Sequence, residues 1–515
     1  MARTFKIHPS IGVARVGNSP DDFFIGPERP NDLAPPPGGY RDAKRRLKRQ
    51  GARFRVFVYN DGQPPRELTA AEGEVEWSLH LANTKAAGDR FHGIRRAEEG
   101  LRNPGHPRDQ LVLDASAGPI KGRGQRAELV STRPFMGKPL TVTLGRMLTD
   151  DDGRLIVLGG YGTAGSPTNT PLEQPGSNFA NREGWYDDVS DGPVTAVVRM
   201  RDGSAAAPAV PAWVIVGPPK FAPALHNPVT LYDTLLQVAI NKGVVPDPSK
   251  APEFRPSFTR DIYRILRRAL GIRWVYADGV SQAPSEQFHG FSRMPPPSRD
   301  RIFGRLRTPA SVLGAAGTGR GTMPKMWSDD FPTAGASGTL TPLQYATMQA
   351  WRDGNFDDDW KGVPAPDEDI TAAGLDRANL ESCVGGPMHP GIEVSYKLRD
   401  TFAFAEPFRL DATRVKPGDA TAQMGVPWQS DFIDCSAEAG DGGSDLTWWP
   451  AQRPIDSWTS ADGTSQLWLR PFPGQPNDEG EMVLPDLITN WYRLGLILEK
   501  DDAYLEVDRV EQEVD

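Results

Sequence analysis

The sequence is poor in cysteine, with two, Cys383 and Cys435, among 515 residues. Two cysteines cannot build a disulfide scaffold, and zinc sites made of paired CxxC motifs are excluded. The chain also lacks an apolar run of about eighteen residues that could cross a bilayer, and its first residues lack the apolar core of a secretory signal. We therefore expect a cytoplasmic protein that does not enter the membrane.

The sequence also has fewer basic than acidic residues. The chain has 58 Lys and Arg against 67 Asp and Glu, a formal net charge of −9. A general nucleic-acid binder would normally show a basic face, so we expect no nucleic acid among the partners. One basic run, from Arg41 to Arg55, is interpreted as solvated surface or, alternatively, as a subunit contact.

Two common ligand-binding patterns are missing as well. The glycine-rich run at 159–162 follows a strand pattern, but it lacks the GxGxxG spacing and leads into a loop, which excludes a dinucleotide site. Asp187, Asp188 and Asp191 lack the alternating spacing of a calcium loop and are expected to cap and close turns. The sequence thus predicts no metal ion and no dissociable cofactor.

The chain does have the means to build a large core. Hydrophobic residues make up 38% of it, and 53 Gly with 49 Pro indicate many turns and long ordered loops. Alternating apolar residues predict strands at 54–58 and 75–81, and a continuous apolar run predicts another at 213–216. Helical patterns occupy 230–242, 257–270 and 341–354. We predict an α+β fold with a β-rich N-terminal region, 1–220, and a mixed α/β catalytic region, 221–515.

The densest chemistry lies in residues 376–397, DRANLESCVGGPMHPGIEVSYK. A short helix is predicted to end at Cys383, where a glycine pair and a proline break it and let backbone approach closely. Beyond this turn, His389, Glu393 and Lys397 add three ionisable groups. On residue types alone, a cysteine in this setting is more often a small buried hydrophobe than a reactive thiol.

The run from Cys383 to Glu393, CVGGPMHPGIE, resembles the cysteine-bearing segment of the cysteine tryptophylquinone oxidases, the family that includes lysine ε-oxidase and a glycine oxidase. Other segments between Ile7 and Pro454 are similar to the same family, namely IHPSIGVARVGNSPDDFFIGPE, EVEWSLHLANTKAA, GWYDDVSDGPV and WWPAQRP. The resemblance implies a cofactor made from the protein itself, cysteine tryptophylquinone. In it, the sulfur of Cys383 is joined by a thioether to a tryptophan ring that is oxidised to a quinone.

The resemblance also suggests roles for single residues. The modified ring corresponds to Trp448 or Trp449, and Trp448 is preferred because its offset from Cys383 fits the family arrangement better. Lys397 matches, by offset, a lysine that the family uses near the quinone, although such a lysine is otherwise usually solvated. His389 stands where the family tends to have an aromatic residue, and it is either a proton shuttle or a structural histidine. Glu393, outside these roles, is expected to be a buried hydrogen-bond partner of the preceding turn.

One position departs from the family pattern. The family places an aspartate four residues before the cysteine, where it assists cofactor assembly, and this chain has Asn379 there. An amide cannot take up a proton as a carboxylate does. Either Glu381 or Asp376 has taken over the role, or the cofactor matures differently.

The function implied is that of a quinoprotein oxidoreductase acting on a CH–NH2 group with O2 as acceptor. A primary amine or amino acid, O2 and water would give a carbonyl compound, ammonia and hydrogen peroxide, as in a lysine 6-oxidase or a glycine oxidase. The resemblance further implies a flavoprotein maturation partner, a homodimer or homotetramer, and in some members export without a recognisable signal peptide.

Two alternatives stay open. The first is a family member without a mature quinone that acts as a non-redox binding or assembly protein, and Asn379 motivates it. The second is an enzyme in which Cys383 is a conventional thiol nucleophile and His389 its base.

Overall fold

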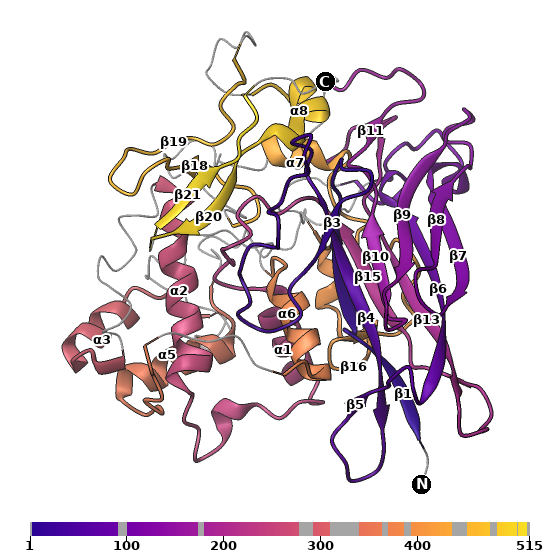
Figure 1. The fold of residues 1–515 in the computed structure, drawn as a ribbon. Helices are drawn as coiled ribbons and strands as arrows, with labels where there is room; N and C mark the ends of the chain where they lie inside the picture. The colour runs from indigo at the N-terminus through magenta and orange to yellow at the C-terminus, as the bar shows by residue number, and fades with distance from the viewer. Residues whose placement is uncertain are drawn as a thin grey trace.

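A computed structural model of the protein describes residues 3–90, 100–173, 180–277, 292–309, 339–362, 369–385, 393–434, 451–473, 482–501 and 503–511. Figure 1 shows a large sheet formed by the N-terminal half, helices beside it, and the C-terminal strands above α2. The fold is α+β with a β-rich N-terminal half, which confirms the predicted fold class. The division at residue 220 stays a prediction.

Thirteen of the described strands form one sheet. Its main path, in spatial order, consists of β7 (Leu113–Lys121), β6 (Gly73–Asn83), β13 (Ser190–Met200), β15 (Ala212–Gly217), β2 (Ile11–Arg15), β4 (Arg49–Tyr59), β10 (Leu155–Gly159), β9 (Val142–Thr149) and β8 (Arg126–Ser131). Off this path, β1 (Thr4–His8), β3 (Phe23–Ile25) and β5 (Arg66–Glu67) pair with β4, and β14 (Ala207–Pro208) pairs with β13. The edge strands β7 and β8 meet where Asp114 N donates to Ser131 Oγ at 3.1 Å, so the sheet curls around its own interior.

The other described strands form two-stranded sheets. They are β11 (Ala164–Gly165) with β12 (Tyr186–Asp187), β16 (Phe404–Glu406) with β17 (Arg409–Leu410), β18 (Asp456–Ser457) with β19 (Gln466–Leu467), and β20 (Leu496–Lys500) with β21 (Ala503–Val507). The described α-helices are α1 (Leu231–Asn241), α2 (Tyr263–Gly271), α3 (Pro296–Phe303), α5 (Pro342–Asp353), α6 (Ala372–Glu381), α7 (Trp428–Asp434) and α8 (Leu484–Asn490). None of these helices is long and apolar enough to cross a membrane.

Local sequence signals place most of these elements. The strands predicted at 54–58, 75–81 and 213–216 lie within β4, β6 and β15 and are confirmed. Thr341 and Gln344 cap α5 reciprocally, and Gly354 ends it with φ of 78°, a conformation that residues with a Cβ rarely adopt. The segment 257–270 differs from a plain helix. It opens with a π-helical turn, η4 (Phe258–Ile262), in which Ile262 N donates to Ser257 O at 3.2 Å, before α2 begins.

Strands β2 and β15 are buried on both faces, as neighbouring parallel strands usually are. One face points into the interior of the curled sheet, and the other packs against α1 and α6. The residues of the second face and its helical cover are Ile11, Val13, Trp213, Ile215, Leu231, Leu235 and Leu380. Fully burying each such aliphatic side chain contributes about 1.5–3 kcal/mol. This apolar contact fixes α6, and the cysteine that follows it, against the sheet.

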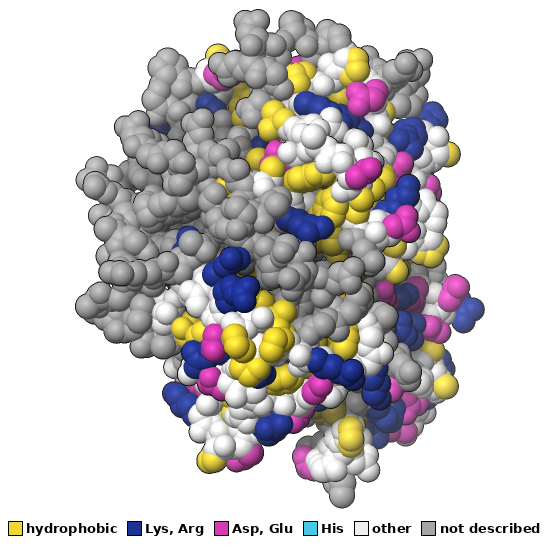
Figure 2. Space-filling view, turned by 90° about the vertical axis from the view of Figure 1, so that its left-hand side faces the viewer, with side chains coloured by type: hydrophobic (Ala, Val, Ile, Leu, Met, Phe, Trp, Pro, Cys, Tyr) yellow, Lys and Arg dark blue, Asp and Glu magenta, His cyan; other side chains and the backbone are white. Residues whose placement is uncertain are grey.

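Two expectations about charged residues need correction. Arg49, from the basic run expected at the surface, is fully buried and donates to Gly159 O at 3.3 Å and to Pro20 O at 2.7 Å. Asp191, expected to close a turn, instead accepts from the side chain of Trp213 at 2.8 Å and from Thr421 N at 2.8 Å. On the face shown in Figure 2, the visible Lys and Arg side chains are interspersed with Asp and Glu.

Candidate functional site

Cys383 lies just beyond the C-terminal end of α6, as the helix-breaking residues predicted. There the chain runs against the start of α1, where Leu231 N donates to Cys383 O at 3.0 Å and Gly385 N donates to Val229 O at 3.2 Å. A Cβ on Gly385 would lie 1.8 Å from Thr230 O, so this close approach requires glycine. Gly385, a few residues past the end of α6, therefore docks the cysteine segment onto α1.

The thiol of Cys383 is enclosed, with the residue only 2% exposed. Beside it lies the buried carboxylate of Glu393, whose Oε2 accepts from Val384 N at 2.7 Å. This bond confirms Glu393 as a hydrogen-bond partner of the turn. Burial, followed by the charge and hydrogen bonding of Glu393, raises the pKa of the Cys383 thiol well above its usual value. The thiol is consequently protonated near neutral pH.

Arg15, at the end of β2, forms an ion pair with Glu393 Oε1, and both side chains are almost fully buried. The other contacts of its guanidinium are to backbone. Nη1 donates to Pro218 O at 3.0 Å and Nη2 donates to Ser382 O at 2.9 Å. Arg15 thus joins three segments, namely β2, the loop that follows β15, and the end of α6, around the cysteine.

Lys220 comes from the loop after β15 and interacts electrostatically with Arg15, Glu393 and Cys383. Its Nζ lies 2.9 Å from Nδ1 of His226. Burial, assisted by the charge of Arg15, lowers the pKa of Lys220 to about 7. Burial and the Lys220 charge likewise lower the pKa of His226 well below its usual value. The amine of Lys220 is therefore a group that gains and loses a proton near neutral pH.

Asp376 and Asn379 lie on the face of α6 that packs on the sheet. Asp376 Oδ1 lies 3.0 Å from His8 Nδ1, and its Oδ2 accepts from Ser10 Oγ at 3.1 Å. Asn379 Oδ1 accepts from Val13 N at 3.1 Å. These bonds hold α6 to β1, β2 and the turn between them, and none of the described hydrogen bonds of the two side chains involves Cys383.

Glu381 is turned toward α2. Its Oε1 accepts from Arg264 at 2.9 Å, from Arg268 at 3.1 Å and from Arg377 at 2.8 Å, and its side chain is 2% exposed. Although burial raises the pKa of Glu381, the three arginine charges outweigh burial and lower it far below the usual value. A carboxylate held so firmly in its ionised form is a poor proton acceptor.

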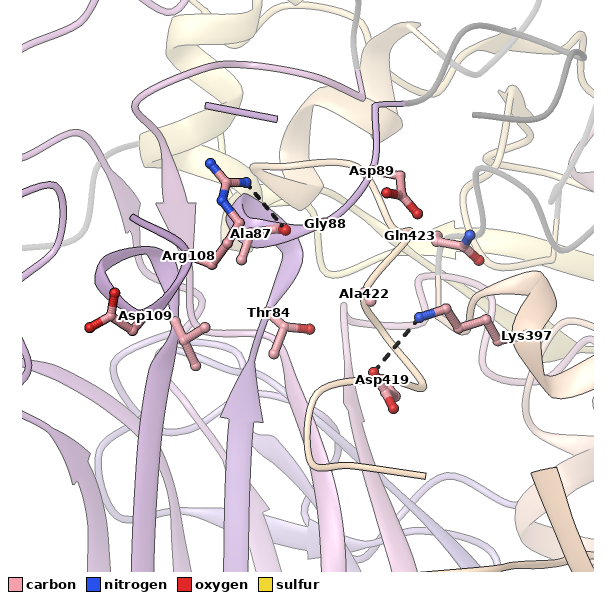
Figure 3. Close-up of a pocket in the computed structure, with 11 residues that line it drawn as sticks. Thr84, Ala87, Gly88, Asp89, Arg108, Asp109, Lys397, Asp419, Ala422 and Gln423 are labelled. Carbon is pink, nitrogen blue, oxygen red and sulfur yellow. Dashed lines mark hydrogen bonds and ion pairs between the residues drawn. The ribbon is translucent and has the colours of Figure 1, made fainter. Parts of the chain in front are cut away.

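Lys397, in the 3-10 helix η8 (Tyr396–Arg399), is exposed, and its Nζ lies 3.7 Å from Asp419 Oδ1. Figure 3 shows this pair at the edge of a pocket of about 370 Å³. Asp89 and Asp109 also line the pocket, so it carries charges of both signs. The described contacts of Lys397 are with this pocket and not with Cys383.

His389 and Trp448 both lie outside the described residues. Trp448 belongs to segment 435–450, and the chain just before this segment contacts the chain just after it. Phe432 O, before this segment, accepts from Arg453 Nε, after it. The ring of Phe432 also lies 5.8 Å, centroid to centroid, from that of Phe221.

The loop that contains Phe221 also contacts the chain immediately beyond segment 435–450. Ala451 N donates to Asn227 Oδ1 at 3.3 Å, and Phe221 N donates to Gln452 O at 3.0 Å. Residues 218–231 thus contact both the Cys383 turn and the chain three residues past Trp448. The two cofactor segments predicted from sequence meet one shared loop, and that loop carries Lys220.

Sequence reasoning missed Arg15, Lys220 and His226. Lys220 is 163 positions from Cys383 (383 − 220), and no spacing rule connects them. The one available signal was its place in a loop directly after a buried strand, where functional side chains are often found. Within the described ranges, no group of three or more His, Cys, Asp or Glu side chains could hold a metal ion.

Comparisons with known proteins give a consistent result. A family model described as L-lysine ε-oxidase N-terminal matches residues 8–216, and one described as L-lysine ε-oxidase C-terminal domain matches residues 325–455. The L-lysine 6-oxidase of Marinomonas mediterranea is 28% identical to this chain, over 84% of the chain and 71% of that relative.

Solved structures agree with this result. The crystal structure of the Schiff base intermediate of the same organism's L-Lys ε-oxidase with L-Lys has a TM-score of 0.77 and 23% identity, covering 99% of this chain and 95% of that one. Another crystal structure of that oxidase has a TM-score of 0.75 over the same shares of the two chains. At this identity the structural likeness establishes the fold.

Proposed function

Since this chain belongs to the L-lysine ε-oxidase family, we propose that it oxidatively deaminates a primary amine or amino acid with O2, using a quinone made from Cys383 and Trp448. It is accordingly an oxidoreductase acting on an amine with O2. The products are a carbonyl compound, ammonia and hydrogen peroxide.

The observation that carries this proposal is the setting of Cys383. Its sulfur is free, 2% exposed and surrounded by Glu393, Arg15 and Lys220 rather than by apolar side chains alone. A cysteine that served only as a small buried hydrophobe would not require a buried carboxylate with two basic residues. Residues 218–231 contact both the Cys383 turn and the chain three residues past Trp448. This shared contact supports a thioether between Cys383 and Trp448.

The described residues around Cys383 fit such a cofactor, in which the Cys383 sulfur would be joined to the ring of Trp448. Once formed, the quinone supplies the electron sink that amino-acid side chains lack. The buried Arg15 and Glu393 fix opposite charges next to the sulfur, where exclusion of water strengthens their effect. Lys220, whose pKa lies at about 7, is the described group best suited to accept a proton at its Nζ near neutral pH.

The name of the relative points to L-lysine as the first amino acid to test.

The thiol-nucleophile alternative loses support. The raised pKa of Cys383 disfavours the thiolate that such an enzyme needs. We further propose, on family membership, that a flavoprotein matures this chain, and that the chain forms a homodimer or homotetramer in the cytoplasm. Light scattering of the matured protein checks the assembly state.

Release of hydrogen peroxide and ammonia tests the proposed reaction. The full chain, co-expressed with a family flavoprotein, is supplied with L-lysine, glycine, other L-amino acids and simple primary amines. We expect peroxide from at least one of them, and a loss of at least about 1000-fold in Cys383→Ala, since the cofactor cannot form.

Cys435→Ala is the matched control, because it removes the other thiol, and it should retain the rate. The proposal is contradicted if no amine yields peroxide, or if Cys383→Ala works as well as Cys435→Ala.

A further inference from the structure

Three carboxylates lie near Cys383 in sequence, and the structure distinguishes between them. Asp376 is bound to His8 and Ser10 at the sheet, and Glu381 is bound to three arginines. Asn379, at the position where the family has an acid, is bound to the backbone of β2. Glu393 is the described carboxylate that interacts with the sulfur itself.

Glu393 is held in one orientation. One carboxylate oxygen faces the buried Arg15, and the other accepts from Val384 N at 2.7 Å, one residue past the cysteine. The strand end at Gly217 lies close against its stem, since a Cβ there would be 3.9 Å from Glu393 Cβ. A side chain fixed on several sides next to a buried thiol is preorganised to exchange a proton with it.

We propose that Glu393 accepts the proton of the Cys383 thiol when the sulfur joins the tryptophan ring, and so does the work of the missing aspartate. The inference depends on the proposed cofactor. In this step the S–H and one ring C–H bond break and the S–C bond forms. One proton passes to Glu393 and the ring proton to solvent, and the two electrons pass to an oxidised flavin, the oxidant class of the proposed maturation partner.

Arg15 is a positioning residue in this step. Its guanidinium is anchored to Pro218 O and Ser382 O, and it therefore orients the carboxylate without needing to move. Lys220 faces the same group from the loop after β15, and Arg268 faces Lys220 from α2. The charge of Arg15 compensates the carboxylate before the transfer in this buried site.

A time course of peptide linkage tests the proposal without relying on amine turnover. Wild type, E393Q, E393D and D376N are purified in full length and unlinked, then mixed with the oxidised flavoprotein in air. The fraction of Cys383 peptide linked to the Trp448 peptide is followed by mass spectrometry. We expect E393Q to link at least about 100-fold more slowly, the usual loss when a positioned base is removed. D376N is the matched control, an acid-to-amide change in the same segment, and should link at the wild-type rate.

Failure of the cofactor and failure of the Glu393 role give different results. If wild type never forms the linked peptide, the proposed cofactor is wrong. If wild type links and E393Q links at the same rate, only the role of Glu393 is overturned, and slow linkage in D376N alone would transfer the role to Asp376.

If E393Q fails to fold, the linkage rate of E393D tests the role of Glu393 instead. It keeps a carboxylate, and we expect it to link within about tenfold of wild type per folded molecule. A folded E393D that links less than about one hundredth as fast as wild type overturns the proposal.

Discussion

Lys220→Met removes a buried amine and keeps a flexible side chain of similar length. In the folded protein, burial and the charge of Arg15 lower the pKa of Lys220 from 10.5 to about 7. Each pKa unit corresponds to about 1.36 kcal/mol, so burying the charged form costs about 5 kcal/mol, from (10.5 − 7) × 1.36. The full cost applies below pH 7, where the amine of Lys220 is charged in both the folded and the unfolded state.

The pH dependence follows from the same shift. Between pH 7 and 10.5 the unfolded chain keeps a proton that the folded chain has lost, so the free energy of unfolding rises with pH. Methionine does not carry this cost, but its introduction leaves His226 Nδ1 without the Lys220 partner, a loss of about 1 kcal/mol. We therefore expect a net gain of about 4 kcal/mol at pH 6. At pH 9 the gain should be smaller by roughly 3 kcal/mol, from (9 − 7) × 1.36.

Urea unfolding followed by tryptophan fluorescence at pH 6 and pH 9 measures both values. Lys242→Met is the matched control, since Lys242 lies at the surface and donates to Thr401 O at 2.7 Å. Its effect should be the same at the two pH values. An equal gain for Lys220→Met at both pH values, or a loss at pH 6, would refute the reasoning about a buried, mostly neutral amine.

Three further substitutions test other parts of the structure. Glu381→Gln removes the carboxylate shared by the buried Arg264 and Arg268 and the half-buried Arg377, and it should lower the free energy of unfolding by about 3–5 kcal/mol in urea. Burial raises the pKa of Asp188 to about 7, so between pH 4 and 7 the folded chain binds a proton that the unfolded chain has lost. Asp188→Asn should therefore raise the free energy of unfolding at pH 8 by up to about 4 kcal/mol and leave it unchanged below pH 4. Melting curves at the two pH values measure this difference. Thr341→Ala removes the cap of α5 and should cost about 1 kcal/mol by urea unfolding, with Thr401→Ala, outside any such capping box, nearly neutral.

Local rules predicted much of the scaffold. Alternation located β4 and β6, a continuous apolar run located β15, and the helix breakers after Cys383 marked the end of α6. Gly385 was recognised as a point of close backbone approach, which the contact with Thr230 O confirms. These features depend on a few adjacent residues, so the sequence carries them directly.

The composition of the site depended on distant contacts. Arg15 meets Ser382 across 367 positions, and nothing local in β2 indicates this. The partners of Asp376 and Glu381 depend on which face of α6 each occupies, the first toward the sheet and the second toward α2. Arg49 was expected at the surface because it belongs to a basic run, but its strand passes through the middle of the sheet.

The central claim is that Cys383 and Trp448 become one cofactor, and peptide mass spectrometry of the matured protein tests it most directly. We predict a single linked species, about 28 Da heavier than the sum of the two peptides, as a thioether with two added carbonyl oxygens requires. It should persist in Trp449→Phe and be absent from Trp448→Phe. Separate, unmodified peptides in a protein that releases peroxide from an amine would contradict the claim.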